Sequence, residues 1–249
     1  MLKYVFALLV FLLPLHAQSI VNIEKINIEQ DDKPFQGEIG LDFSGASGNS
    51  DTQAISLASR MQWNNDSTQF VVIKYDYAKS SDVLSADKTF FHYRNIFSSA
   101  GQRSPELYFQ LQNDEFKLLK IRSLLGAGYR FKLNSNSSDS SSRLGAGVFY
   151  SQEEYNDIKN SIEEVARLNL YYTYQLKINN TTHFVSTTYY QPDIENTSDY
   201  RALEQASLEF NLSEDLLYYL TVDISYDNHP VDNIEKDDTS YKSGIKYRF

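Results

Sequence analysis

An alternation of apolar and polar side chains, with a period of two residues, runs through most of this chain from Phe35 onward. It is clearest at the carboxyl end. There, every odd position from Tyr241 to Phe249 except Ser243 is aromatic or aliphatic, and every even position is charged or Gly. Successive side chains of a β-strand point to opposite faces, so such a segment forms a strand with one apolar and one polar face. The sequence therefore predicts an all-β fold.

The alternating segments number about twelve, and short runs of Asn, Asp, Gly and Ser separate them as hairpin turns. Counted from Phe35, the odd-numbered connections are mostly longer and more acidic, whereas most even-numbered connections are tight, as at Asn64–Ser67 and Asn179–Asn180. Long outer loops and short periplasmic turns are typical of bacterial outer-membrane barrels. The tip at Asn113–Asp114 and the Ser- and Asn-rich tract 134–142 depart from this pattern.

We therefore predict a transmembrane, antiparallel, up-and-down β-barrel of about twelve strands in the bacterial outer membrane, with both termini in the periplasm. The mature chain contains no apolar run long enough for a membrane-spanning helix. Its polar mean hydropathy of -0.46 is compatible with a barrel, because half of each strand faces a polar lumen. The competing architecture is a soluble β-sandwich or lipocalin-like barrel. The strand lengths and the aromatic residues on the predicted outer faces argue against it.

The amino-terminal residues have the pattern of a secretory signal peptide. Lys3 supplies a positive charge, Val5–Leu15 is apolar, and Leu15-His16-Ala17 offers a cleavage site. We expect a signal peptide over residues 1–17, a periplasmic or lumen-entering extension over 18–34, and the barrel over 35–249.

Several segments together resemble a known family: Gly37–Asp51 (GEIGLDFSGASGNSD), Leu119–Lys132 (LKIRSLLGAGYRFK), Tyr226–Val231 (YDNHPV) and the terminal GIKYRF. In order and spacing they are similar to the bacterial outer-membrane β-barrel family of unknown function whose members are labelled salt-induced outer membrane protein. The resemblance runs from about Phe35 to Phe249. It implies a barrel in the outer membrane, and it implies no assigned activity and no catalytic residue.

The last strand also resembles the carboxyl-terminal signal of outer-membrane barrels, in which a terminal aromatic residue is read by the assembly machinery. The residues of this signal are Phe249, Tyr247 and Ile245. The expected partners are outer-membrane lipids and the barrel-assembly machinery. The net charge of -10 argues against nucleic acid as a partner.

Nearly all basic residues within strands fall on the face predicted to line the lumen, because a charge facing lipid at mid-depth costs about 2–4 kcal/mol. Fewer acids share that face, namely Glu38, Asp42, Asp76, Glu209 and Asp223. Two interpretations are open: a plugged, ion-paired interior, or a narrow anion-preferring pore for small solutes or ions. The candidate lumenal basic cluster consists of Arg60, Arg94, Arg122, Arg130, Arg143 and Arg167.

Acidic clusters in the predicted outer loops also have two interpretations. They are Glu153-Glu154-Asp157, Glu163-Glu164 and Asp232–Asp238. Such clusters are usually solvated surface, although carboxylate oxygens can also hold divalent cations or take part in recognition. Neither of the two predicted loops that contain these clusters matches a dedicated calcium-binding motif.

Catalysis is the remaining class of function. The mature chain has only His92, His183 and His229 as histidines, and it contains no G-x-S-x-G motif, metal-ligand spacing or phosphate-binding loop. His92 is predicted to be a packed polar residue of the lumen, and the chain has no Cys for disulfides or a lipid anchor. We therefore predict a protein that is not an enzyme and has no cofactor; a lipid-modifying barrel enzyme is the less favoured alternative.

Overall fold

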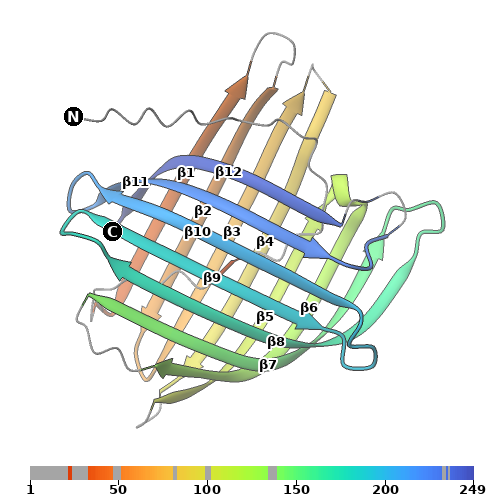
Figure 1. Cartoon of the computed structure of the whole chain (residues 1–249), viewed down its shortest axis with the longest axis horizontal. Coiled ribbons are helices and arrows are strands. Elements are labelled where there is room, and N and C mark those ends of the chain that lie inside the picture. The colour runs from red at the N-terminus through yellow and green to blue at the C-terminus, as the bar shows by residue number, and fades with distance from the viewer. Residues whose placement is uncertain are drawn as a thin grey trace, which may run out of the picture.

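The computed structural model describes residues 22–23, 33–46, 52–80, 83–98, 102–133, 139–231, 234 and 236–249. Twelve strands form a closed antiparallel barrel in which β1 pairs with β12, and Figure 1 shows β7–β12 crossing in front of β1–β6. The predicted fold class is confirmed. The strands are β1 (Phe35–Ala46), β2 (Thr52–Asn64), β3 (Ser67–Ser80), β4 (Val83–Phe97), β5 (Arg103–Asp114), β6 (Leu119–Leu133), β7 (Ser140–Tyr155), β8 (Ile162–Lys177), β9 (Thr182–Pro192), β10 (Tyr200–Asn211), β11 (Leu216–Asp227) and β12 (Asp237–Arg248).

One short 3-10 helix, η1 (Glu115–Lys117), connects β5 to β6, and Leu118 follows it in the left-handed conformation with φ 55°. The sequence predicts only a tight tip here, because a single helical turn has no periodicity to reveal it. No helix in the described part of the chain is long and apolar enough to cross a membrane.

At one end of the barrel, the last residue of the chain meets the first strand. We call this the terminus end and the opposite end of the barrel the far end. The backbones of Gly37 and Phe249 exchange two hydrogen bonds, of 2.8 and 3.0 Å. The ring of Phe249 covers Gly37 so closely that a Cβ at residue 37 would lie 2.4 Å from a ring carbon. Phe249 also contacts the rings of Phe35 and Tyr247, at centroid distances of 6.1 and 6.2 Å.

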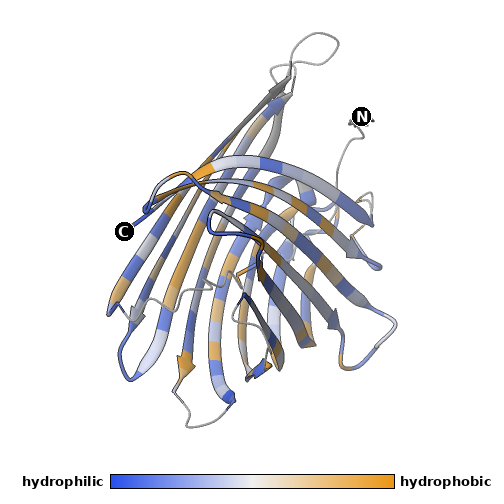
Figure 2. Cartoon of the chain, turned by 60° about the vertical axis from the view of Figure 1, so that its left-hand side comes forward, coloured by the Kyte–Doolittle hydropathy of each residue, from blue (hydrophilic) through white to orange (hydrophobic). Residues whose placement is uncertain are grey.

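Apolar side chains form the outer surface and polar ones turn inward, as the alternation predicts. Figure 2 shows this alternation as blue and orange residues along the strands. On β6, Leu125 is 67% exposed, whereas Leu124 is 8% exposed and packs in the lumen against Tyr108 and Phe149. For β9 the sequence leaves the outer face open, because Phe184–Tyr190 alternates poorly. The structure turns Val185, Thr187 and Tyr189 inward.

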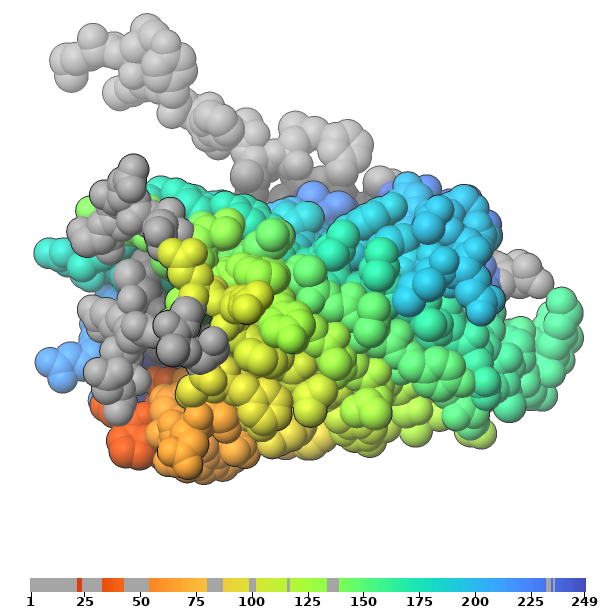
Figure 3. Space-filling view, turned by 90° about the horizontal axis from the view of Figure 1, so that it is seen from below, coloured from red at the N-terminus to blue at the C-terminus, as the bar shows by residue number. Residues whose placement is uncertain are grey.

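The core of the protein lies inside the barrel. A cluster of buried apolar side chains joins strands from opposite parts of the wall: Ile23, Phe70, Val72, Phe90, Tyr171, Tyr189 and Leu203. Ile23 precedes β1 in the chain, so at least Asn22 and Ile23 of the expected extension 18–34 lie in the lumen. From outside, the wall is a continuous surface from the orange strands β2 and β3 to the green and teal strands that follow (Figure 3).

The boundaries of the acidic loops differ from the predicted ones. β7 continues to Tyr155, so Glu153 lies in a strand and is fully buried, and Glu163 and Glu164 lie in β8. The last two residues of the predicted acidic cluster Asp232–Asp238 likewise belong to β12, while residues 232, 233 and 235 lie outside the described part of the chain. Runs of acidic residues in a sequence suggest solvated loops. Here buried arginine side chains of the barrel neutralise Glu153, so β7 can continue through this acidic run.

Candidate functional site in the lumen

All members of the predicted basic cluster lie on strands with their side chains on the lumenal face, but they do not gather at one place. They divide instead according to their partners. Arg94 and Arg130 share one acid, Arg122 binds another, Arg167 pairs near the far end, and Arg60 lies against Phe70. Arg143, on β7 near the terminus end, is half-buried.

The middle of the lumen holds a buried ion pair. Arg94 Nη1 lies 3.0 Å from Glu106 Oε2, and the two side chains are 1% and 2% exposed. The Tyr171 hydroxyl donates to Glu106 at 3.1 Å and accepts from Arg130 Nε at 3.1 Å. The Arg94 guanidinium also lies 4.9 Å from the ring centroid of Tyr108, so its flat face is covered. β4, β5, β6 and β8 are thereby joined across the interior.

A second buried network lies toward the far end and centres on Glu153. Arg122 donates to Glu153 at 2.8 Å, and Arg201 donates to both of its carboxylate oxygens at 2.9 and 3.1 Å. The hydroxyl of Tyr155 donates to the same carboxylate at 2.5 Å. Arg201 also binds Asp227 through Nε at 2.9 Å. Both acids are 0% exposed, and burial on this scale is tolerated because each charge has partners in hydrogen-bonding geometry.

Further ion pairs continue to both ends of the barrel. Arg167 binds Asp199 at 3.0 Å near the far end, and Lys246 binds Glu209 at 2.9 Å near the terminus end. Asp42 accepts a hydrogen bond from the Tyr219 hydroxyl, and Asp76 lies 4.0 Å from Lys242.

The acids that bind the arginines are mostly not those that the sequence suggests. Glu106, Glu153 and Asp227 lie outside the predicted lumenal set, and Arg201 lies outside the predicted basic set. Parity along the strand is the signal that could find Glu106, since it shares the inward face of β5 with Tyr108 and Gln112. Several of the buried lumenal bases therefore have acid partners that the sequence does not indicate.

A small cavity of about 30 Å³ remains near mid-lumen. It has room for roughly two water molecules. No carboxylate is among its described lining residues, which are mainly hydrogen-bond donors and aromatic rings. They are Ile23, His92, Arg94, Tyr108, Gln110, Arg122, Leu124, Phe149, Asn169, Tyr189, Gln191 and Arg201.

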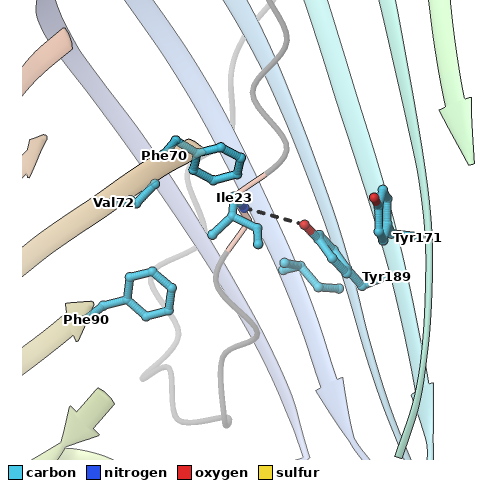
Figure 4. Close-up of a cluster of buried hydrophobic side chains, with 7 residues drawn as sticks. Ile23, Phe70, Val72, Phe90, Tyr171 and Tyr189 are labelled. Carbon is cyan, nitrogen blue, oxygen red and sulfur yellow. Dashed lines mark hydrogen bonds between the residues drawn. The ribbon is translucent and has the colours of Figure 1, made fainter. Parts of the chain in front are cut away.

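Ile23 lines one side of this cavity, and Asn22 precedes it in the chain. Asn22 and Ile23 are 4% and 5% exposed, and they lie within the lumen rather than in the sheet. Figure 4 shows Ile23 between Phe70, Val72 and Phe90 on one side and Tyr189 on the other.

The remaining titratable groups do not form a catalytic constellation. His92 is 1% exposed in the lumen, where it contacts Gln110 at 3.3 Å and stacks between aromatic rings. His183 lies on β9 near Asn211, and His229 lies in the β11–β12 connection. Within the described residues, no group of three or more His, Cys, Asp or Glu side chains is placed to hold a metal ion. Outside the strands, hydrogen bonds from Ser161 lower the pKa of Asp157.

Residues 37–249 match a family described as protein of unknown function, DUF481. The chain belongs to the DUF481 family. No curated protein matches this DUF481 chain. Among solved structures, it is similar to the NanC porin, with a TM-score of 0.55 and 9% identity over 85% of this chain and 98% of that one.

Two further similar structures have the same architecture. The translocator domain of the autotransporter NalP from Neisseria meningitidis gives a TM-score of 0.53 at 8% identity, over 86% of this chain and 88% of that one. The KdgM porin in complex with disordered oligogalacturonate gives 0.50 at 13% identity, over 86% and 99%. Such low identities report on the fold alone. This DUF481 chain therefore has the fold of a porin-like β-barrel.

Proposed function

We propose that this protein is a narrow outer-membrane channel that binds small anionic solutes at mid-lumen and is closed in the conformation described here. The observation that carries the proposal is the composition of the cavity wall, which is lined by guanidinium and amide groups of Arg94, Arg122, Arg201, Gln110 and Asn169. The carboxylates that pair with these arginines, Glu106 and Glu153, are not among the described lining residues. Guanidinium groups bind carboxylates with directional, charge-assisted hydrogen bonds. Aromatic rings beside them offer flat apolar surfaces to a sugar or similar ring.

The fold-level comparison supports this choice of solute. The KdgM porin was solved in complex with oligogalacturonate, which is an acidic oligosaccharide. A likeness of this kind concerns the architecture, and the solute preference must come from this chain's own lining residues. Ion pairs on both sides of the cavity leave no free path for large solutes, so a solute must displace something in order to pass.

The orientation belongs to the same proposal. Phe249, Tyr247 and Ile245 form the assembly signal that the terminal strand presents to the assembly machinery, and both termini face the periplasm. The far-end connections, including the β7–β8 and β11–β12 loops, then face outward. No step of this function is catalytic.

A second candidate is a structural barrel with a permanently filled lumen. Buried networks centred on Glu106 and Glu153 favour it, because together they tie β4, β5, β6, β7, β8 and β10 across the interior. In that case the outer acidic loops would serve recognition or contact with divalent cations.

Conductance of the refolded protein in planar bilayers under a KCl gradient separates the two. A channel gives anion-selective steps. In the Gln110→Glu/Asn169→Asp variant, carboxylates are added to the cavity wall, and the reversal potential should move toward cation selectivity. Gln175→Glu is the matched control, because Gln175 is buried on the lumenal face but does not line the cavity. Ile23→Lys places a charge on the residue that covers the cavity. If neither the wild type nor this variant conducts, the result would support the structural barrel.

A further inference from the structure

Asn22 and Ile23, which precede β1 in the chain, are held in the lumen by side chains of the barrel wall. Asn22 Nδ2 donates to Gln205 Oε1 at 2.8 Å, and the Ile23 amide donates to the Tyr189 hydroxyl at 3.5 Å (Figure 4). The Ile23 side chain packs against β3 on one wall and against β9 and β10 on the other. These two residues therefore bridge the lumen at the level of the cavity.

Cationic side chains bind the two carbonyl oxygens of this dipeptide. Lys74 Nζ donates to the Asn22 carbonyl at 3.3 Å, and Arg60 Nη1 donates to the Ile23 carbonyl at 3.3 Å. The Arg60 guanidinium lies 4.1 Å from the ring centroid of Phe70, which fixes its orientation. We call Arg60, Lys74, Tyr189 and Gln205 the cradle.

A charged ligand can compete for the cradle, although it must overcome the repulsion of Asp223, which accepts a hydrogen bond from Gln205. The present bonds from Lys74 and Arg60 to the carbonyl oxygens have an ionised donor only, whereas a carboxylate would bring a full negative charge and form an ion pair with either side chain. Residues 22 and 23 also lose backbone freedom when they are held. A carboxylated solute that reaches Arg60 and Lys74 can therefore compete with the dipeptide.

We propose that the cradle is a carboxylate-binding site whose resident occupant is the chain's own Asn22–Ile23, so that an acidic solute and this plug exclude each other. The inference rests on the proposed channel function and specifies how the lumen opens. When the dipeptide leaves, Ile23 no longer covers the cavity, and the cradle becomes continuous with the Arg- and amide-lined wall. The solute class is a carboxylated sugar or a comparable organic acid.

Crosslinking tests the plug without requiring conductance. The chain has no Cys, so Asn22→Cys with Gln205→Cys places unique thiols at two groups now 2.8 Å apart. A short bifunctional thiol reagent should join them in refolded, heat-modifiable barrel. Asn22→Cys with Ala206→Cys is the control, because residue 206 is on the opposite, outward face of β10 and should not crosslink.

Competition is then measured on the same pair. Sodium glucuronate should lower the crosslinking yield several-fold, whereas glucose at equal concentration and sodium chloride at equal ionic strength should leave it unchanged. Equal yields for residues 205 and 206, or a yield that glucuronate does not change, would overturn the inference. Conductance of Ile23→Lys, with exposed Ile158→Lys as the matched control, bears separately on the function. If glucuronate displaces the plug but no variant conducts, the proposed channel function is wrong and the proposed carboxylate-binding site stands.

Discussion

At the scale of single residues, burial of charge is the dominant feature of this lumen. Glu153 is 0% exposed and binds Arg122 and Arg201 together. Removing a charge from water costs several kcal/mol per ion. Ion pairing and hydrogen bonding compensate for this cost only while all of the partners are present. Loss of one member is therefore more harmful than loss of an exposed ion pair.

Glu153→Gln should lower the free energy of unfolding by about 3–5 kcal/mol, because it leaves two buried guanidinium groups with a neutral partner. Its neighbour Glu154 is the control. Glu154 pairs with Lys120 at 3.2 Å, but these side chains are 35% and 60% exposed, so Glu154→Gln should cost at most about 1 kcal/mol. Urea unfolding in lipid vesicles measures both. Similar losses at the two positions would contradict the burial of residue 153.

At the scale of elements, β6 shows how the outward-facing residues of one strand are expected to lie at different depths in a membrane. Leu125 is near the middle of the strand and points outward, and Leu133 is at its end and also exposed. Leu125→Arg should cost about 2–4 kcal/mol in a bilayer, whereas Leu133→Arg should cost about 0–1 kcal/mol because an interfacial charge reaches water. Unfolding in vesicles gives both values. If the two substitutions lower the free energy of unfolding by the same amount, β6 lies at a different depth in the bilayer than expected.

The η1 connection supplies a pH-dependent prediction. Burial lowers the pKa of Lys117 to about 7, although Asp114 and Asp238 attract its charge and only Lys88 opposes it. Lys117 Nζ lies 3.5 Å from Asp238 Oδ2, so η1 is tied to β12. Since the folded pKa is below the unfolded value near 10.4, the stability of the fold should rise as pH rises from about 7 toward that value.

Lys117→Met removes this buried cation, so it should stabilise the barrel more at pH 6 than at pH 9. Lys120→Met is the control, because Lys120 is exposed and should show no such difference. Melting temperatures of refolded protein at the two pH values measure the effect. A larger gain at pH 9 would mean that the ion pair with Asp238 outweighs the desolvation of Lys117.

The strands and their faces are predictable because their signal is local. The parity of Leu124 and Leu125 follows from a few neighbouring residues, and the structure agrees with it. The partners inside the lumen are not predictable in this way. Glu153 on β7 meets Arg201 on β10 only after the barrel has closed, and no local pattern in the sequence encodes that distance. The position of Ile23 depends in the same manner on two opposite walls.

At the scale of the whole molecule, closure and occupation of the lumen are coupled. The outer surface is apolar as the membrane requires, and the polar groups displaced to the inside largely neutralise one another. Ion pairs and the Asn22–Ile23 dipeptide together fill the middle of the barrel. In the proposed channel, conduction requires that part of this interior moves. The plug is a better candidate for that movement than the ion pairs, because its carbonyls bring only a partial charge to Lys74 and Arg60, whereas both partners of an ion pair are fully charged.

Phe249 joins the first strand of the barrel to the last and is also the expected assembly signal. Its backbone pairs with Gly37, so Phe249→Ala keeps the two backbone hydrogen bonds and removes only the ring. We expect the amount of heat-modifiable barrel in the outer membrane to fall several-fold while synthesis continues, because the machinery loses the aromatic group that it reads. Tyr241→Ala, which removes a 69% exposed ring from the far end of the same strand, should leave the amount unchanged. Refolding of the purified variants in detergent separates recognition from stability. If Phe249→Ala refolds with an unchanged melting temperature, the ring is a signal; if its melting temperature falls as far as its membrane level, the ring serves mainly to close β1 against β12.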